Sequence, residues 1–179
     1  MRKKKTLIII IITIVNLLSY LGYNIITKAN EKNEIAKQIQ TTPKFELKTL
    51  DSIPFTNSNL KPNLKPNLNT IFIYFNSECD FCLHEAKNIS QNLNKFKNVQ
   101  FIFVSTEEID TIKQFSERYK LNNQPNVTFL YDNLDTFSSQ FDATSIPYVL
   151  IYDQNKKLIK KHKGQLSAKG ILRALQEND

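Results

Sequence analysis

The sequence of 179 residues predicts an α/β domain, whose central sheet is covered by helices on both faces, behind an apolar N-terminal helix. The domain is predicted because apolar runs typical of buried strands alternate with segments that repeat apolar residues every three or four positions. The N-terminal helix is predicted from an uncharged apolar run at residues 7–26. We therefore expect a membrane anchor (1–27), a polar stalk (28–42) and the α/β domain (43–179).

The apolar run LIIIIITIVNLLSYLGYNII begins at Leu7 and ends at Ile26. As a helix its 20 residues would be about 30 Å long, the thickness of a hydrocarbon core. A cleaved signal peptide is the alternative, but the run is longer than a typical signal sequence and TKANEKNE after it offers no A-x-A site. We expect a single pass through the cytoplasmic (inner) membrane.

Basic residues fill positions 2–5, directly before the apolar run. They favour a cytoplasmic N-terminus, which makes the domain extracytoplasmic, or periplasmic. They also account for four units of the net charge of +7, and the other residues carry 20 basic and 17 acidic side chains. This mild excess is not the concentrated basic footprint of a duplex binder, so we expect no nucleic-acid partner.

The numbers of cysteines and glycines exclude several classes of protein and of binding motif. Two cysteines cannot form a disulfide-stapled mini-protein or a zinc site made of cysteine alone. Three glycines, at positions 22, 164 and 170, cannot form a dinucleotide-binding or P-loop fingerprint.

The predicted domain opens with two short strands, at 45–47 and 53–55. The repeat NLKPNLKPNL at 59–68 contains two prolines and is expected to be an extended surface loop, with a proline-rich docking motif as the alternative. Residues 71–75 (IFIYF) form a continuously apolar strand, and a helix follows the cysteines to about residue 97.

The second half continues the alternation. We expect strands at 99–104, 127–130 and 148–152, a helix at 107–119, a helical turn at 137–141, a lysine-rich edge strand at 156–163, and a final helix capped by Ser167. Lysines on the edge strand guard it against pairing with another chain, and contact with anionic lipid or an acidic partner is the alternative.

The two cysteines form a C-x-x-C sequence, Cys79 and Cys82, where a buried strand gives way to a helix. Free N–H groups and the positive end of the helix dipole favour a thiolate there. The three-residue offset lets a second thiol attack a mixed disulfide on the first. We expect Cys79 to be the exposed attacking thiol and Cys82 the resolving thiol.

Two other interpretations of the cysteines stay open, an inert disulfide and a pair of unreactive core thiols. A metal site would need His84 and His162 as further ligands. His84 follows Cys82 by two positions and points away from the pair on a helix, so we expect no metal. No cofactor is expected either.

The sequence resembles the thioredoxin superfamily, and within it the membrane-anchored TlpA-like thiol–disulfide oxidoreductases. The resemblance rests on the P-x-F-x-L segment at 43–47, the strand followed by C-x-x-C and a helix, Ser145-Ile146-Pro147 before a buried strand, and Gly164. It implies a three-layer α/β/α sandwich with a central mixed sheet. It also implies that the Ile146–Pro147 bond is cis, that Pro147 faces the cysteines, and that Ile146 and Pro147 bind substrate.

The resemblance further implies a role for Glu85, which stands three residues after Cys82. A carboxylate there would accept the Cys82 proton during exchange. A solvated helical glutamate, or an acid that complements the helix dipole, is the alternative. The chain departs from the family at Glu78, where tryptophan is common and a negative charge disfavours a thiolate, and at Lys87, where proline is usual.

These residues predict an extracytoplasmic, membrane-anchored thiol–disulfide oxidoreductase. The resemblance implies a reductant of specific protein disulfides, supplied with electrons by a membrane redox donor. An oxidase or isomerase on the same fold, or a non-catalytic anchored binding or scaffold protein, is the alternative. A peroxidase is disfavoured because no cysteine has the Pro-x-x-x-Thr-x-x-Cys setting.

Overall fold

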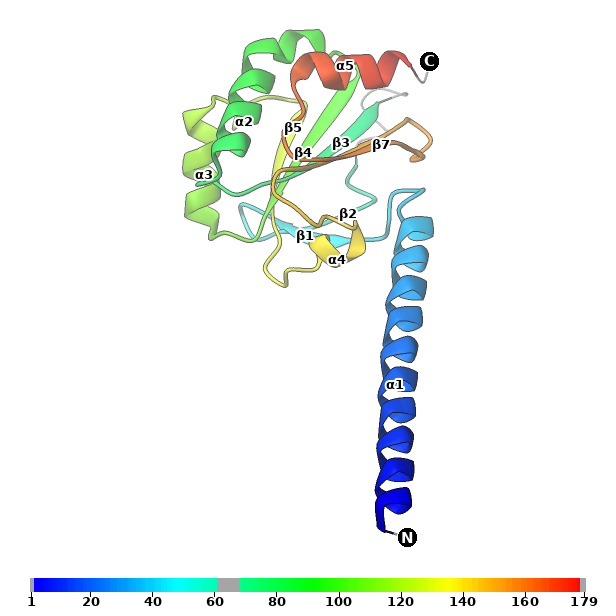
Figure 1. Cartoon of the computed structure of the whole chain (residues 1–179). Helices are drawn as coiled ribbons and strands as arrows, with labels where there is room; N and C mark the ends of the chain where they lie inside the picture. Colours follow the sequence, from blue (N-terminus) through cyan, green and yellow to red (C-terminus); the bar gives the residue numbers. More distant parts are fainter. Residues whose placement is uncertain (1, 61–67, 178–179) are drawn as a thin grey trace. The chain divides into compact units, whose positions relative to one another are not determined.

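The computed structural model describes residues 2–60 and 68–177, with side chains from residue 12 onward. It divides into two compact units, Met1–Lys37 and Gln38–Asp179. Helix α1 (Arg2–Gln38), shown in blue in Figure 1, makes up the first unit except for its last residue, Gln38, which belongs to the second. The predicted anchor and most of the predicted stalk are therefore one continuous helix.

A membrane span is not found in the part of the chain that the structure describes, where no helix is both long and apolar enough to cross a bilayer. The predicted span at residues 7–26 begins among residues 2–11, whose side chains lie outside the described part. Its described large apolar side chains, from Ile12 to Ile26, are mostly exposed on α1.

The second unit begins earlier than the predicted domain boundary at residue 43. Ile39 is fully buried, Thr41 pairs with Lys157 in an isolated antiparallel bridge, and the N–H of Thr42 donates to the carbonyl of Lys156. Residues 38–42, which we assigned to the stalk, thus belong to the folded domain because one buried apolar side chain and one antiparallel bridge hold them there.

The domain is built on a seven-stranded mixed sheet in the order β2-β1-β5-β4-β3-β6-β7 (Figure 1). The central strands β3, β4 and β5 are parallel, and the other pairs are antiparallel. The strands are β1 (Glu46–Thr49), β2 (Pro54–Thr56), β3 (Asn69–Tyr74), β4 (Val99–Ser105), β5 (Val127–Tyr131), β6 (Tyr148–Tyr152) and β7 (Leu158–Lys163). This topology confirms the predicted α/β fold with a central mixed sheet.

Helices cover both faces of this sheet. On one face lie α2 (Asp80–Asn92), α3 (Ile109–Arg118) and α5 (Ala168–Gln176); on the other lies the short α4 (Phe137–Gln140) (Figure 1). The side chains of β3 alternate between the faces, with Ile71 and Ile73 in the core under α2, α3 and α5, and Phe72 and Tyr74 in the core under α4. Because both faces are covered, β3 and β4 each contain a continuous run of apolar residues, at positions 71–74 and 101–104.

Two predicted boundaries shift for local reasons. The helix after the cysteines ends at Asn92 rather than near residue 97, and a 3-10 turn (Leu93–Lys95) follows. The Asn92 amide donates to the carbonyl of Asn88, a side-chain bond that competes with the helix backbone. Strand β7 begins at Leu158 because Lys156 adopts a positive φ of 66° in the preceding turn. The central part of the predicted surface loop, residues 61–67, lies outside the described residues.

Candidate active site

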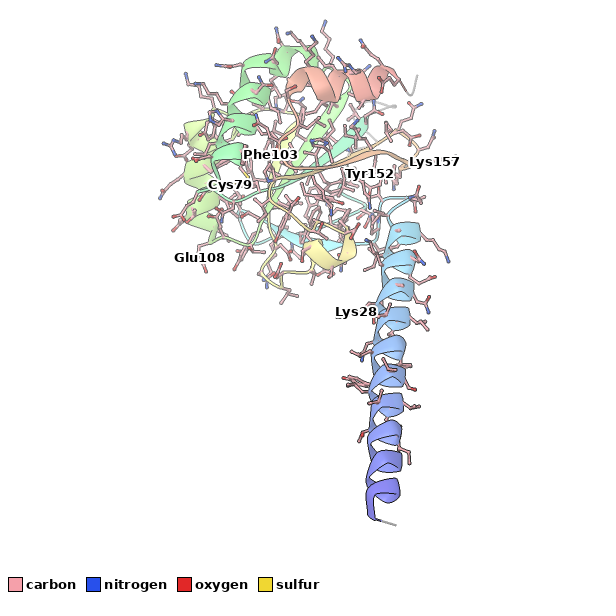
Figure 2. All side chains as sticks on the ribbon, viewed as in Figure 1. Lys28, Cys79, Phe103, Glu108, Tyr152 and Lys157 are labelled. Carbon is pink, nitrogen blue, oxygen red and sulfur yellow. The ribbon has the colours of Figure 1, made fainter. Side chains whose placement is uncertain are left out.

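Both cysteines lie where the sequence places them, at the junction of β3 and α2. Cys79, labelled in Figure 2, is the N-cap residue of α2, with extended backbone angles (φ −80°, ψ 114°). Cys82 stands in the first turn of the helix. The backbone N–H of Leu83 donates to the carbonyl of Cys79 and closes that turn. Cys79 therefore lies at the start of α2, where the first N–H groups of a helix have no intrahelical partner, although its side chain makes no cap hydrogen bond.

The two thiols differ in exposure. Cys79 is partly exposed, whereas Cys82 is 2% exposed and packs among the core residues of this face. The Sγ of Cys79 lies 3.8 Å from the carbonyl oxygen of Ile146, and the Ile146–Pro147 peptide bond is cis, as predicted. The structure thus brings Cys79, Ile146 and Pro147 together, with Ile146 exposed and Pro147 buried.

Cys82 is shielded from ionisation. Its burial raises the pKa of the thiol well above the ordinary value, and the neighbouring Cys79 and Glu85 add to this shift. A backbone hydrogen bond from Asn76 acts in the opposite direction and lowers the pKa of Cys82. Cys82 is therefore a thiol at neutral pH and must lose its proton before it can act as a nucleophile.

Glu85 is buried beside this thiol, with 1% of its surface exposed. Its Oε1 accepts a hydrogen bond of 2.8 Å from the backbone N–H of Leu166, and its Oε2 has no hydrogen-bond partner. Burial raises the pKa of Glu85 to about 8, although the bond from Leu166 opposes the shift. The alternative of a solvated surface glutamate is therefore wrong, because the side chain points into the protein.

Glu107 is a residue that the sequence analysis missed. Its carboxylate accepts hydrogen bonds from the backbone N–H of Ser77 (2.7 Å) and from the Ser77 hydroxyl (2.6 Å), two residues before Cys79. The sequence places Glu107 at the start of a predicted helix, where acids are common. Only its position after β4, the strand paired with β3, hints that it could reach the cysteine loop.

The other side chains that the sequence singled out make no hydrogen bond to Cys79 or Cys82 among the contacts of the described residues. Glu78, His84 and Lys87 are exposed on the surface of the domain. The Nε2 of His162 lies 3.2 Å from the carbonyl oxygen of Gln165. Within residues 12–60 and 68–177, no group of three or more His, Cys, Asp or Glu side chains is arranged to hold a metal ion.

The AhpC/TSA family model matches residues 39–174, most of the folded domain. The chain belongs to the AhpC/TSA family. With the thioredoxin-like fold, this membership makes the chain a thioredoxin-like thiol–disulfide oxidoreductase. No curated protein matches the chain.

Solved structures share the fold at low sequence identity. A secreted Mycobacterium tuberculosis disulfide oxidoreductase, described as homologous to E. coli DsbE, is 19% identical with a TM-score of 0.61, covering 79% of this chain and 98% of its own. The exposed lipoprotein thioredoxin Etrx1 of Streptococcus pneumoniae is 21% identical with a TM-score of 0.56, covering 75% of this chain and 98% of its own. The peroxidoxin BcpB of Mycobacterium tuberculosis is 17% identical with a TM-score of 0.63, and the match covers 78% of this chain and 96% of BcpB.

Proposed function

We propose that this AhpC/TSA family member is a membrane-anchored, extracytoplasmic reductant of protein disulfides that works through the Cys79–Cys82 dithiol. The observation that carries the proposal is the asymmetry of the two sulfurs. Cys79 is partly exposed at the start of α2, and Cys82 is buried one turn further along. One thiol is thus placed to meet a substrate, and the other is placed to resolve the adduct.

The reaction follows from this placement in two steps. The Cys79 thiolate attacks one sulfur of the substrate disulfide, which forms a mixed disulfide and releases the other substrate sulfur as a thiolate. Cys82 then loses its proton to the ionised form of buried Glu85, which its raised pKa of about 8 makes the minor form at neutral pH, and attacks the Cys79 sulfur. The second substrate sulfur leaves, and the enzyme retains a Cys79–Cys82 disulfide that a membrane redox donor must reduce.

A reducing direction is supported by the surroundings of the dithiol. Strong oxidants of this chemistry stabilise their reduced form as a thiolate. Here burial and the neighbouring Glu85 raise the pKa of Cys82, and two acids, Glu78 and Asp80, flank Cys79. These features leave the reduced form without extra stabilisation, so the dithiol donates electrons readily.

Peroxidase chemistry, which the family name and the likeness to a peroxidoxin raise as a second candidate, is disfavoured by the sequence. The position three residues before Cys79 holds Asn76, where the Pro-x-x-x-Thr-x-x-Cys setting requires threonine. No other cysteine has that setting.

The membrane anchor in this proposal is supported by the uncharged run at residues 7–26 and the basic residues before it. The exposed apolar side chains of α1 are consistent with a helix that needs an apolar environment. Fractionation of cells that express the full chain, followed by protease treatment of intact cells or spheroplasts, tests it. We expect the protein in the membrane fraction with its domain digested from outside. A soluble protein would contradict the anchor, and a protected domain would contradict the extracytoplasmic location.

The activity is tested with the reduced full-length protein and a protein disulfide. We expect reduction of the disulfide by the wild type and none by Cys79→Ser, since the attacking sulfur is gone. Cys82→Ser should accumulate a stable mixed disulfide at Cys79, which mass spectrometry detects. Equal turnover by Cys79→Ser would overturn the assignment.

A further inference from the structure

The loop that leads into the cysteines, residues 76–78, is fixed from outside its own strand and helix. The Oε2 of Glu107 accepts from the backbone N–H of Ser77 at 2.7 Å, and its Oε1 accepts from the Ser77 hydroxyl at 2.6 Å. Ser77 is therefore held by two hydrogen bonds to one carboxylate, a geometry that restricts both its position and its rotation.

Glu107 is itself held in place from the end of β4. The hydroxyl of the buried Ser105 donates to Oε2 of Glu107 at 3.1 Å, and the backbone N–H of Glu107 donates to the same hydroxyl at 3.2 Å. Since β4 is a central strand paired with both β3 and β5, the carboxylate belongs to the rigid part of the domain.

The position of this loop sets the position of Asn76, whose backbone is hydrogen-bonded near both cysteines. The side-chain oxygen of Asn76 accepts from the N–H of Glu78 at 2.9 Å, and the backbone carbonyl of Asn76 lies 3.4 Å from the N–H of Cys79. The backbone of Asn76 also makes the hydrogen bond that lowers the pKa of Cys82. A displacement of Ser77 would therefore reach both cysteines through its neighbour Asn76.

We propose that Glu107 is a positioning residue for thiol–disulfide exchange, whose hydrogen bonds to Ser77 hold the Asn76 backbone against Cys82 and so support the resolving step. The inference deepens the proposed function and rests on it. Glu107 touches neither sulfur in the contacts described, so it acts only through the loop.

The resolving step is the one that should depend most on this support. When Cys82 attacks the mixed disulfide it must first become a thiolate inside the protein, and a donor N–H at its sulfur is worth most at that moment. The first attack uses Cys79, which is partly exposed at the start of α2. Loosening the loop should slow the second step more than the first.

Dithiobis(nitrobenzoate) separates the two steps on the reduced full-length protein. Attack by Cys79 breaks the reagent's S–S bond, forms a mixed disulfide and releases one coloured nitrothiobenzoate anion. Attack by Cys82 on the Cys79 sulfur then releases the second anion and leaves the Cys79–Cys82 disulfide. The two absorbance phases, followed in stopped flow as a function of pH, report one cysteine each.

We expect Glu107→Ala to slow the second phase by about fivefold at neutral pH and to move its pH profile upward, with a smaller change in the first phase. The other titratable groups that act on Cys82, Cys79 and Glu85, are unchanged in this variant. Glu107→Gln should restore most of the rate, because its amide oxygen can accept from the Ser77 N–H and its NH₂ can donate to the Ser77 hydroxyl. Ser77→Ala, which keeps the backbone bond, should give an intermediate rate.

Glu108→Ala is the matched control, because Glu108 is the exposed neighbour and makes no side-chain cap bond to α3. Second phases in Glu107→Ala and Ser77→Ala that match this control in rate and pH profile would overturn the inference, as would equal slowing of both phases. If Glu107→Ala does not fold, Ser77→Ala decides the matter alone. Failure of the proposed function is distinguishable, because the wild type itself would then fail to reduce the protein disulfide.

Discussion

Glu85 and Leu166 join two helices of the same layer: Oε1 of Glu85, on α2, accepts a hydrogen bond of 2.8 Å from the backbone N–H of Leu166, just before α5. One carboxylate oxygen thus has a structural partner, and the other, Oε2, is buried without one. The unpartnered oxygen is the atom available to take a proton from Cys82, and its burial makes the ionised form costly.

The cost of ionising buried Glu85 can be measured as the difference in unfolding free energy between the wild type and Glu85→Gln. Because burial raises the pKa of Glu85 to about 8, the folded state holds its proton between the ordinary value of 4.5 and pH 8. The stability that this protonated group confers is complete at the acid end and is lost as the pH rises through 8, by about 3–5 kcal/mol in total. We expect Glu85→Gln to gain stability relative to the wild type from about pH 5 to about pH 9.

Urea unfolding of both proteins across that range measures the difference. A constant difference between wild type and variant at every pH would show that the pKa of Glu85 is the same in the folded and unfolded states, which would contradict the shift caused by burial. The same variant should lose the fast resolving step, because a glutamine cannot accept the Cys82 proton.

Alkylation should distinguish the two thiols of the reduced protein. Cys79 is partly exposed, while Cys82 is 2% exposed and its pKa is raised by burial. We expect iodoacetamide at neutral pH to modify Cys79 more than about tenfold faster than Cys82, as measured by peptide mass spectrometry over time. Equal rates, or faster modification of Cys82, would contradict the assigned roles.

The exposed apolar side chains beside Cys79 should affect protein substrates only. Phe81 is 63% exposed and Ile146 is 42% exposed, so neither contributes much to the core. We expect Phe81→Ala and Ile146→Ala each to raise KM for a protein disulfide by about threefold, through lost apolar contact, without changing the reaction with dithiobis(nitrobenzoate). Ile53→Ala, at a similarly exposed residue between β1 and β2, should leave KM unchanged. An equal effect of Ile53→Ala would remove the case for a local contact.

Asp132 should be a stability determinant of the face covered by α4. It is 2% exposed, and its carboxylate accepts from the backbone N–H groups of Thr136 (3.0 Å) and Phe137 (2.8 Å). We expect Asp132→Ala to lower the free energy of unfolding by about 2–3 kcal/mol, because the buried N–H of Phe137 loses its partner. Urea unfolding measures the loss, and a loss no larger than that of the exposed neighbour Asn133→Ala would contradict it.

Much of the fold could be predicted because it depends on local patterns. The apolar runs at β3, β4 and β6 and the Ser167 cap of α5, whose Oγ accepts from the N–H of Gly170, are visible in the sequence. The cis bond before Pro147 was implied by the family resemblance and is confirmed.

The parts that could not be predicted depend on contacts between distant segments. The antiparallel pairing of β1 with β5 cannot be recognised from the residues of either strand. The bond from Ser77 to Glu107 spans 30 positions, and the burial of Glu85 depends on how α5 packs on α2. Residues 38–42 look like a polar stalk in sequence, and only Ile39 signals that this segment is packed into the domain.

The central claim, that Cys79 and Cys82 form a reducing dithiol, is tested most directly by the equilibrium potential of the full-length protein. Titration against glutathione and dithiothreitol buffers, with the two redox states counted by mass spectrometry, gives that potential. We expect one reversible two-electron couple near the value of thioredoxin, about −270 mV. A value near that of the strong oxidants, about −120 mV, or the absence of any Cys79–Cys82 disulfide, would contradict the account.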